Sequence, residues 1–455
     1  MRDRVDLLVH GDVVVTMDGS RSQITDGAIA VRGEWIVAVT TQADAAAWLD
    51  ADRTIGGPGT VVIPGLVNAH QHLTGDRLIR STIPDDLPPG AALTDWALPV
   101  HAAHTGDDDE LSATLSLVEA VTNGITYTVE AGTVAHPERV LAAYDAVGVG
   151  GTLGAWGWDL GDGPHVAHLD EVIERQAATV SMARDHPRVD AFVTLVGHDL
   201  MSDGLAVAAS ELARATSNRL TFHLSPGPAD ARAYLARTGE RPVVHLARLG
   251  VLGDHVLLAH AVHIDDAELD LLLDLDVAVA SCPWAYLRLG QGVTRSFHHP
   301  RMLHHGGRVA LGCDSENAGD AIDVLLAARL FAGLTKDTTG DPTRFTARAA
   351  LALATIDGAR AIGKADEIGS LEVGKRADIV VVDTTRPEWT PHAVDPITAL
   401  VWASDGRAIR DVVASGRHVV RDGRCLTVDH QMLAAESRDA HRRLVSRARA
   451  HPRDQ

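Results

Sequence analysis

Val61-Val62-Ile63-Pro64-Gly65-Leu66-Val67-Asn68-Ala69-His70-Gln71-His72 is the stretch of sequence from which the fold can be predicted. Residues 61–69 form an apolar run rich in Val, Ile and Leu, which indicates a buried strand rather than an amphipathic element. Residues two apart on a strand point to the same side. His70 and His72 would therefore project together and could bind one metal ion. An HxH pair is a weak signal alone, because two surface histidines give the same pattern.

The middle of the chain alternates between strand-like and helical segments. The expected strands are 61–69, 125–130, 150–155, 190–197, 219–224, 255–260, 277–281 and 308–313. The expected helices include 107–122, 168–185, 204–217, 227–238 and 265–274. This alternation implies a parallel sheet of the α/β class and predicts a (β/α)8 TIM barrel, with a doubly wound open sheet as the alternative.

Both ends of the chain have a different sequence pattern. Apolar and polar residues alternate in short segments, which are separated by turns such as Asp18-Gly19. We expect them to build one composite β-sandwich domain. Residues 1–60 would supply its N-terminal part and residues 367–427 its C-terminal part. The barrel would span 61–366, and 428–455 would form a C-terminal helix or tail.

Composition and charge exclude several classes of function. The net charge of −20 at pH 7 argues against binding nucleic acid or an anionic membrane surface. Cys282, Cys313 and Cys425 are far apart, so neither a disulfide framework nor a thiolate zinc site is expected. The first residues have no signal-type segment, and no run approaches the roughly 18 apolar residues of a spanning helix. We expect a cytoplasmic protein.

Polar residues end most of the expected strands. In a (β/α)8 barrel the chemistry lies at the C-terminal ends of the strands. The residues at these ends are His70, His72, Glu130, His198, Asp199, His223, His260, Asp314 and Glu316. This distribution predicts one site assembled from several strands.

Three imidazoles and one carboxylate, from His70, His72, His223 and Asp314, make a site rich in nitrogen and oxygen ligands. Zn²⁺ suits this set best, and Fe²⁺ or Mn²⁺ also accept it. One position would remain for a water molecule, whose pKa a bound Zn²⁺ lowers to about 7. Asp314 could take a proton from that water, and His260 could hydrogen-bond the attacking hydroxide or a developing oxyanion.

Several segments together resemble the amidohydrolase superfamily, closest to its cytosine-deaminase, adenosylhomocysteine-deaminase and triazine-hydrolase branch. They are Pro64-Gly65-Leu66-Val67-Asn68-Ala69-His70-Gln71-His72, Leu257-Leu258-Ala259-His260-Ala261-Val262-His263, Ala310-Leu311-Gly312-Cys313-Asp314-Ser315 and residues 368–380. The resemblance covers about residues 5 to 425 and implies a barrel with a β-sandwich.

The resemblance also implies roles for individual residues. His70, His72, His223 and Asp314 match the mononuclear metal ligands. His260 matches a histidine that contacts the water or the substrate. His198 is similar to a histidine that contacts the substrate, and no lysine ends the fourth expected strand. One metal ion is therefore expected, without the carbamylated bridge of binuclear members.

One departure concerns proton transfer. Many deaminases of this branch carry a glutamate three residues after the histidine of the fifth strand, and Pro226 stands there in this chain. Proline cannot transfer a proton. Either Glu316, Glu130 or Asp199 substitutes, or Asp314 alone handles the protons. Among these we favour Glu316 as a catalytic residue beside Asp314 and His260.

The segment 281–290 departs as well, because it lacks the usual His-Asn start. We expect Trp96, Trp284 and Arg288, together with His198, to contact a planar and partly anionic substrate, since aromatic rings stack and Arg pairs with carboxylates. The pairs His298-His299 and His304-His305 are expected at the surface.

These observations predict a metal-dependent hydrolase of non-peptide C–N bonds that deaminates a nitrogen heterocycle by attack of metal-bound hydroxide. Ring opening of a cyclic amide, with Asp314 as the sole acid and base, is one alternative, and displacement of a halide or amine is another. A non-catalytic scaffold that retains the barrel is the alternative from a different class. A homodimer is the expected assembly, because dimers are the commonest oligomers.

Overall fold

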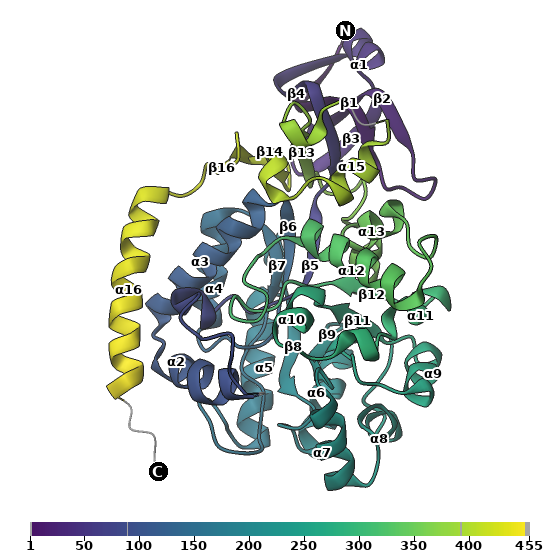
Figure 1. Ribbon diagram of the computed structural model, residues 1–455. Coiled ribbons are helices and arrows are strands. Elements are labelled where there is room, and N and C mark those ends of the chain that lie inside the picture. The colour runs from purple at the N-terminus through teal and green to yellow at the C-terminus, as the bar shows by residue number, and fades with distance from the viewer. Residues whose placement is uncertain (1, 89, 392–393, 451–455) are drawn as a thin grey trace.

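The computed structural model describes residues 2–88, 90–391 and 394–450. Its central feature is an eight-stranded sheet in the order β12-β11-β10-β9-β8-β7-β6-β5, in which neighbouring strands are parallel (Figure 1). The strands are β5 (Leu66–Gln71), β6 (Ile125–Glu130), β7 (Gly150–Leu153), β8 (Val189–Gly197), β9 (Arg219–Leu224), β10 (Val256–His260), β11 (Ala278–Ser281) and β12 (Val309–Leu311). The backbone N–H groups of Cys313 and Asp314 donate to the carbonyl of His70 at 3.1 and 3.0 Å. These bonds join the last strand to the first, so the predicted barrel is confirmed and the open sheet is wrong.

Helices follow the strands and surround the sheet in Figure 1. They are α3 (Gly106–Thr122), α4 (Pro137–Val147), α5 (Leu169–Ala183), α6 (Asp203–Ala215), α7 (Pro228–Thr238), α8 (Pro242–Arg248), α9 (Asp266–Asp274), α10 (Pro283–Arg288), α11 (His299–His304), α12 (Val324–Thr339), α13 (Ala347–Leu353) and α14 (Ile356–Ala361). Helix α3 begins where the Thr105 side chain accepts from the N–H of Asp108 while the Asp108 side chain accepts from the N–H of Thr105. Such a capping box satisfies two backbone donors that a helix start leaves free.

A second sheet combines both ends of the chain. Its order is β16-β15-β14-β13-β4-β1-β2-β3, with parallel pairing of β1 and β4 and antiparallel pairing elsewhere. The strands are β1 (Asp3–Val15), β2 (Gln23–Arg32), β3 (Trp35–Thr41), β4 (Leu49–Pro64), β13 (Ile379–Asp383), β14 (Ile409–Ala414), β15 (Arg417–Arg421) and β16 (Arg424–Cys425). The two ends of the chain meet where β4 pairs with β13, as their shared alternating sequence pattern predicted.

The apolar run 61–69 is divided between the two sheets, so a single strand over this range is wrong. Residues 61–64 end β4, whereas β5 begins at Leu66. Gly65 lies between them, and a Cβ atom there would meet Thr126 Oγ1 at 2.1 Å. Both halves are buried and apolar, so hydrophobicity alone does not reveal the break.

The segment between β5 and α3 is long and covers one side of the barrel mouth. It contains η1 (Asp76–Ile79), the π-helical turn η2 (Ala92–Ala97) and α2 (Leu98–Ala103). The C-terminal helix α16 (His430–Ala450) packs against this segment at the edge of the molecule (Figure 1). Their shared buried cluster comprises Leu78, Ile79, Ile83, Val100, Ala103, Leu111, Ala440 and Leu444.

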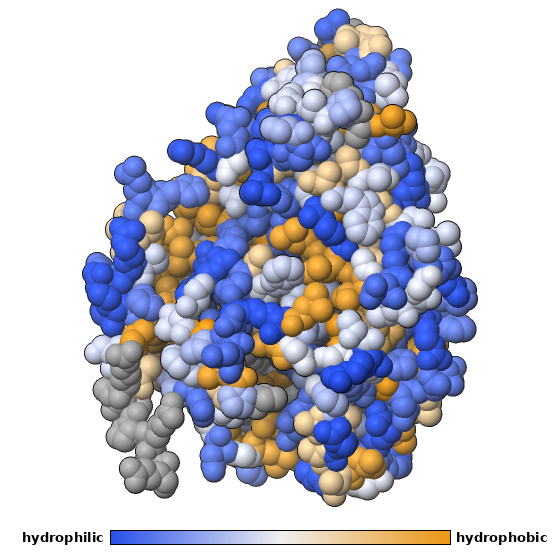
Figure 2. Space-filling model, in the orientation of Figure 1, coloured by the Kyte–Doolittle hydropathy of each residue, from blue (hydrophilic) through white to orange (hydrophobic). Residues whose placement is uncertain are grey.

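Hydrophilic residues cover much of the periphery in Figure 2, and hydrophobic residues show mainly toward the middle of the face in view. Over the part of the chain that the structure describes, no helix combines the length and the apolar character needed to cross a membrane.

Candidate metal centre

The four predicted ligands lie together at the C-terminal ends of β5, β9 and β12. His72 Nε2 lies 3.2 Å from His223 Nε2 and 3.5 Å from Asp314 Oδ1. His70 Nε2 lies 3.7 Å from the same Asp314 oxygen. A zinc–nitrogen bond of about 2.0–2.1 Å in tetrahedral geometry places ligand atoms roughly 3.4 Å apart. The spacing of these donors therefore fits one transition-metal ion.

His260, at the end of β10, borders the same centre. Its Nε2 lies 3.9 Å from Asp314 Oδ2, and its ring centroid lies 5.1 Å from that of His223. Nitrogens of His70, His223 and His260 form one group close enough to hold an ion, and His70, Asp314 and Cys282 form another. Sequence reasoning missed Cys282. Burial raises the pKa of its thiol well above the usual value, so it remains a protonated and poor ligand.

Electrostatics keep the predicted ligands in the protonation states that could bind a metal. Burial lowers the pKa of His72 well below its usual value and that of His223 to about 4, so both imidazoles are neutral near pH 7. Burial would raise the pKa of Asp314, but the adjoining imidazoles of His70 and His260 outweigh it and hold that pKa well below normal. Metal binding requires neutral imidazole and ionised carboxylate. His70 Nε2 is buried and has no hydrogen-bond partner among the described residues.

Hydrogen bonds behind the ligands orient their rings. Thr133 Oγ1 lies 3.0 Å from His72 Nδ1, and the Val196 carbonyl accepts from His223 Nδ1. A partner on Nδ1 fixes the ring so that Nε2 faces the centre. Asn68 supports His70 through the backbone, since its Oδ1 accepts from the His70 N–H at 3.3 Å.

The backbone at three strand ends adopts a conformation that non-glycine residues rarely use. The φ angles are +72° at His260, +66° at Asp314 and +44° at Ser225. Such left-handed residues cost energy and gather at functional sites, where the surrounding structure enforces them. Here they turn the chain directly beside the predicted metal ligands.

The three carboxylates considered as substitutes for the missing glutamate lie in different environments. Glu130 accepts from the backbone N–H groups of Leu73, Gly132 and Thr133 at 2.8, 2.9 and 3.1 Å, so it holds the loops behind His72. Asp199 is half exposed, with Oδ1 3.9 Å from His198 Nδ1.

Glu316 is buried on the side of the site that faces η1 and α3. It accepts from Ser116 Oγ at 2.7 Å and lies 3.7 Å from Arg77 Nη1. Burial raises the pKa of Glu316 to about 7. A catalytic role for Glu316 stays a prediction.

The residues predicted to contact the substrate differ in burial and in the partners they already have. His198 is buried, and its Nε2 has no partner among the residues the structure describes. Trp284 is 39% exposed, whereas Trp96 packs against the cluster under α16. Arg288 Nη1 lies 2.6 Å from Asp320 Oδ2, so its charge already has an internal partner. Their roles toward a substrate stay predictions.

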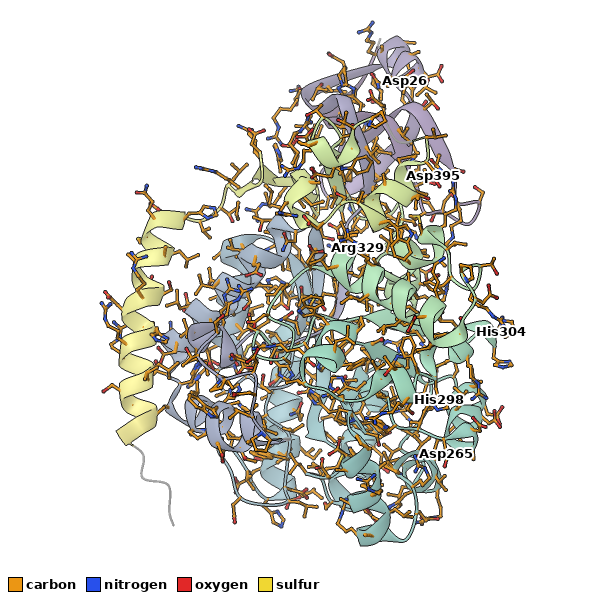
Figure 3. All side chains as sticks on the ribbon, viewed as in Figure 1. Asp26, Asp265, His298, His304, Arg329 and Asp395 are labelled. Carbon is orange, nitrogen blue, oxygen red and sulfur yellow. The ribbon has the colours of Figure 1, made fainter. Side chains whose placement is uncertain are left out.

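His299 is a correction to the expected surface pairs. It is buried, and its Nε2 donates to the carbonyl of His260 at 2.7 Å while Nδ1 lies 3.0 Å from Ser281 Oγ. His304 is exposed at the edge of the molecule, as predicted (Figure 3). His298 and His299 are consecutive at the start of α11, where neighbours face different directions, so a sequence pair does not imply a shared environment.

Asp76 and Asn317 are buried polar residues that sequence reasoning also missed. Asp76 follows His72 by four residues, and Asn317 follows Asp314 by three. This proximity to the two ligand-bearing motifs was the only sequence signal available for either residue.

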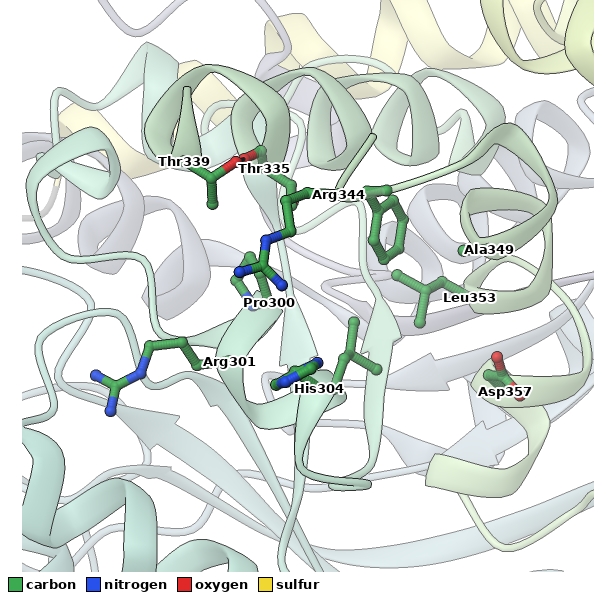
Figure 4. Close-up of a pocket in the computed structure, with 11 residues that line it drawn as sticks. Pro300, Arg301, His304, Thr335, Thr339, Arg344, Ala349, Leu353 and Asp357 are labelled. Atoms are coloured by element: carbon green, nitrogen blue, oxygen red, sulfur yellow. Dashed lines mark hydrogen bonds between the residues drawn. The ribbon is translucent and has the colours of Figure 1, made fainter. Parts of the chain in front are cut away.

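A cavity of about 390 Å³ lies away from this centre (Figure 4). It is lined by Pro300, Arg301, Leu303, His304, Thr335, Thr339, Arg344, Phe345, Ala349, Leu353 and Asp357. His304 ends α11 and Thr339 ends α12. Barrel helices run antiparallel to the strands, so their C-terminal ends lie opposite the catalytic face. None of the predicted site residues lines this cavity.

Comparison with known proteins agrees with this geometry. The chain is 32% identical over 426 residues to a 5-methylthioadenosine/S-adenosylhomocysteine deaminase of Syntrophobacter fumaroxidans, covering 94% of this chain and 95% of the relative. It is 30% identical over 424 residues to a 5'-deoxyadenosine deaminase of Methanothermobacter thermautotrophicus, covering 92% and 94%.

Solved structures show the same architecture. An adenosine deaminase from Xanthomonas campestris with bound zinc has a TM-score of 0.92 at 28% identity, covering 98% of this chain and all of that one. An atrazine chlorohydrolase from Arthrobacter aurescens complexed with zinc matches in fold, with a TM-score of 0.88 at 24% identity over 96% and 100% of the two chains. The model of the amidohydrolase family matches residues 61–419. The chain belongs to the amidohydrolase family.

Proposed function

We propose that this protein is a metal-dependent aminohydrolase that removes an amino group from a nitrogen heterocycle, with an adenine nucleoside as the substrate class. The observation that carries the proposal is the convergence of three buried imidazoles and one carboxylate at the C-terminal ends of the barrel strands. The names of the relatives, which are deaminases of adenine nucleosides, support the substrate class.

His70, His72, His223 and Asp314 would hold one divalent ion, for which we propose Zn²⁺. Neutral imidazole and carboxylate donors suit Zn²⁺, and zinc is present in two structures of similar fold. Strand β8 ends in Gly197 and His198 follows it, so this strand end offers no lysine to bridge a second ion. A bound divalent ion lowers the pKa of a coordinated water to about 7 and so supplies the nucleophile.

Asp314 would transfer protons, and His260 would stabilise the negative charge that develops on oxygen. Asp314 is ionised and can accept a proton as the nucleophile attacks, then return it to the departing amine. His260 is buried and neutral, since burial lowers its pKa well below the usual value. A neutral imidazole beside Asp314 can donate a hydrogen bond to the oxygen that develops negative charge.

Opening of a cyclic amide is the second candidate reaction, and Pro226 is the observation that favours it. Deamination needs a proton at a ring nitrogen, whereas ring opening can proceed with Asp314 as the single acid and base. A non-catalytic scaffold is disfavoured by the retention of all four ligands.

The test is a substrate panel with the zinc-loaded protein. The panel contains 5'-methylthioadenosine, S-adenosylhomocysteine, 5'-deoxyadenosine, cytosine and a series of cyclic amides, with ammonia release and product mass measured together. Deamination releases ammonia, whereas ring opening retains every nitrogen. Metal-depleted protein and Asp314→Asn should both be inactive. Full activity in either sample would overturn the proposal.

We also propose that the enzyme acts in the cytoplasm as a homodimer. The acidic charge, the absence of paired cysteine motifs and the frequency of two-fold assemblies support these two points. Light scattering of the purified protein tests the assembly directly, and a monomeric mass at micromolar concentration would contradict it.

A further inference from the structure

Asp76 is a buried carboxyl beside the metal centre with no role so far. It begins η1, and only 5% of it is exposed. Among the residues that the structure describes, its Oδ1 has no hydrogen-bond partner. A buried polar atom without a partner costs about 1–3 kcal/mol, so such atoms call for an explanation, such as a ligand that satisfies them.

Asn317 is a second buried group of this kind, close to Asp76. It lies on the loop after β12, and 6% of it is exposed. Neither its Oδ1 nor its Nδ2 has a hydrogen-bond partner within the described ranges. One carboxyl oxygen of Asp76 and the Asn317 carboxamide, buried and without partners by geometry, thus lie near one another next to the segment that carries Asp314.

The electrostatic setting allows Asp76 to hold a proton. Burial raises the pKa of Asp76, and the negative charge of Asp314 acts in the same direction. Ser315 and Asn317 lower the pKa of Asp76, but they do not cancel the increase that burial causes. A carboxyl whose raised pKa favours the protonated form can act as a general acid.

The backbone turn before Asp76 is held in place by its conformation and by close packing. Gly75 has a φ angle of +83°, a conformation that favours glycine. A Cβ atom at Gly75 would lie 1.9 Å from Cε1 of His101, whose side chain is buried against the turn. Close packing of His101 on Gly75 therefore fixes the start of η1.

The other carboxylates considered for this proton transfer lie in settings that suit it less well. Glu130 accepts three backbone hydrogen bonds behind His72, and Asp199 is half exposed. Glu316 accepts from Ser116 and faces Arg77. Glu316 Oε2 also lacks a partner among the described residues, but this carboxylate faces the Arg77 guanidinium. Asp76 differs in that its unpartnered oxygen lies near a buried amide, that of Asn317.

We propose that Asp76, with Asn317 beside it, binds the amidine edge of the heterocycle and performs the proton transfer for which position 226 has no carboxylate. This inference rests on the proposed deaminase function. A carboxylic acid matches an amidine edge because its O–H donates to the ring nitrogen while its second oxygen accepts from the exocyclic amine. The Asn317 amide can add one donor and one acceptor.

The proton steps balance with Asp76 and Asp314 as the two carriers. As the water oxygen bonds to the amine-bearing carbon, the C=N electron pair moves to the ring nitrogen, which takes the proton of Asp76. The proton of the water passes to Asp314. When the exocyclic C–N bond breaks, Asp314 returns its proton to the amine, which leaves as ammonia. The hydroxyl proton of the intermediate passes to Asp76, a carbonyl forms, and both carboxyls regain their first state.

The experiment compares zinc-loaded wild type with Asp76→Asn, Asp76→Glu and Asn317→Ala, and with the rivals Asp199→Asn and Glu316→Gln. The substrate is 5'-methylthioadenosine, and its 1-deaza analogue, which lacks the ring nitrogen, is the competitor. We expect Asp76→Asn to lower kcat about 10²- to 10⁴-fold with unchanged zinc content and thermal stability. Asp76→Glu should restore part of the rate, and Asn317→Ala should raise KM about tenfold.

Two further readouts separate a proton carrier from a structural residue. Asp76→Asn should abolish the fall in kcat at high pH that reports the acid, and it should lose the preference of wild type for substrate over the 1-deaza analogue in direct binding. Retention of kcat within about threefold, or a larger loss in either rival variant, would overturn the proposal. If wild type deaminates no adenine nucleoside, the proposed function fails first and this inference falls with it. If wild type deaminates and Asp76→Asn is unaffected, only this inference fails.

Discussion

Asn68 on the first barrel strand accepts a hydrogen bond from the backbone N–H of Cys313, at 3.1 Å, one residue before Asp314. The same Oδ1 accepts from the N–H of His70, and Asn68 Nδ2 donates to Gln71 Oε1 at 3.0 Å. One fully buried amide thus joins the first and last strands at the point where each presents a predicted metal ligand.

Asn68→Ala should therefore weaken both folding and metal binding. It removes the side-chain acceptor of the His70 N–H and one of the two acceptors of the Cys313 N–H, which still donates to the His70 carbonyl. Loss of an acceptor for a buried donor costs about 1–3 kcal/mol. Metal affinity should fall about 10- to 100-fold, as when residues that orient ligands are removed. Urea unfolding and zinc titration measure the two effects. Asn218→Ala, in the loop before β9 and away from the centre, is the matched control. Equal zinc affinity in both variants would contradict the role given to Asn68.

Thr133→Val tests the orientation of His72 without changing side-chain size. The variant removes the partner of His72 Nδ1, so the ring can rotate and Nε2 loses its fixed direction. We expect zinc affinity to fall about 10- to 100-fold with little change in fold. Competition with a chromophoric chelator measures it. Thr179→Val is the control, because that buried hydroxyl bonds only to the Arg175 carbonyl within α5. The interpretation fails if the two variants bind zinc equally well.

Asp378, at the junction of the two sheets, should make stability depend on pH. Burial raises its pKa from 3.8 to about 6. Below about pH 4 both folded and unfolded states hold the proton. As pH rises toward 6 the unfolded state loses it while the folded state keeps it, so stability falls by about 3 kcal/mol and then levels off.

Asp378→Asn should remove that part of the pH dependence, because the amide stays neutral and its oxygen can still accept from the Ser415 N–H. Unfolding by urea at several pH values between 4 and 7 measures the difference between variant and wild type. Asp422→Asn, at an exposed position of the same sheet region, is the control. A difference that stays constant with pH for Asp378→Asn would refute the prediction.

Leu444→Ala should loosen α16 from the segment that carries Asp76. Leu444 is fully buried in the cluster with Leu78, and His441 Nδ1 donates to the Leu78 carbonyl at 2.7 Å. Loss of a buried leucine costs about 2–5 kcal/mol. We expect faster proteolysis within α16 and a higher KM. Met432→Ala, on the exposed side of α16, should change stability by less than about 0.5 kcal/mol. Equal proteolysis rates in the two variants would contradict this packing role.

Local patterns predicted the elements that depend on local physics. The expected helix 107–122 begins within one residue of α3, because the Thr105 cap and the acidic first turn are readable from the chain. The expected strand 219–224 coincides with β9. The convergence of His70, His72, His223 and Asp314 was predictable because barrel chemistry lies at strand ends, and their residue types suit a metal.

Other features of the site depend on how segments far apart in the sequence pack against one another. The ion pair between Arg288 and Asp320 joins the segments after two different strands, and the role of Arg288 toward a substrate stays a prediction. His299 was expected at the surface, yet it supports the backbone of His260. The sequence gives residue type and spacing, whereas these outcomes depend on packing between segments far apart in the chain.

The sequence by itself determined the barrel, the union of the chain ends and the positions of the four predicted metal ligands at the strand ends. Periodicity records which residues are buried, and the C-terminal ends of parallel strands converge at one face. Only the tertiary structure divided the run 61–69 at Gly65, because two buried strands have the same hydrophobic signature. Only the tertiary structure brought Asp76 and Asn317 together beside Asp314, because the meeting of two irregular loops leaves no period in the sequence.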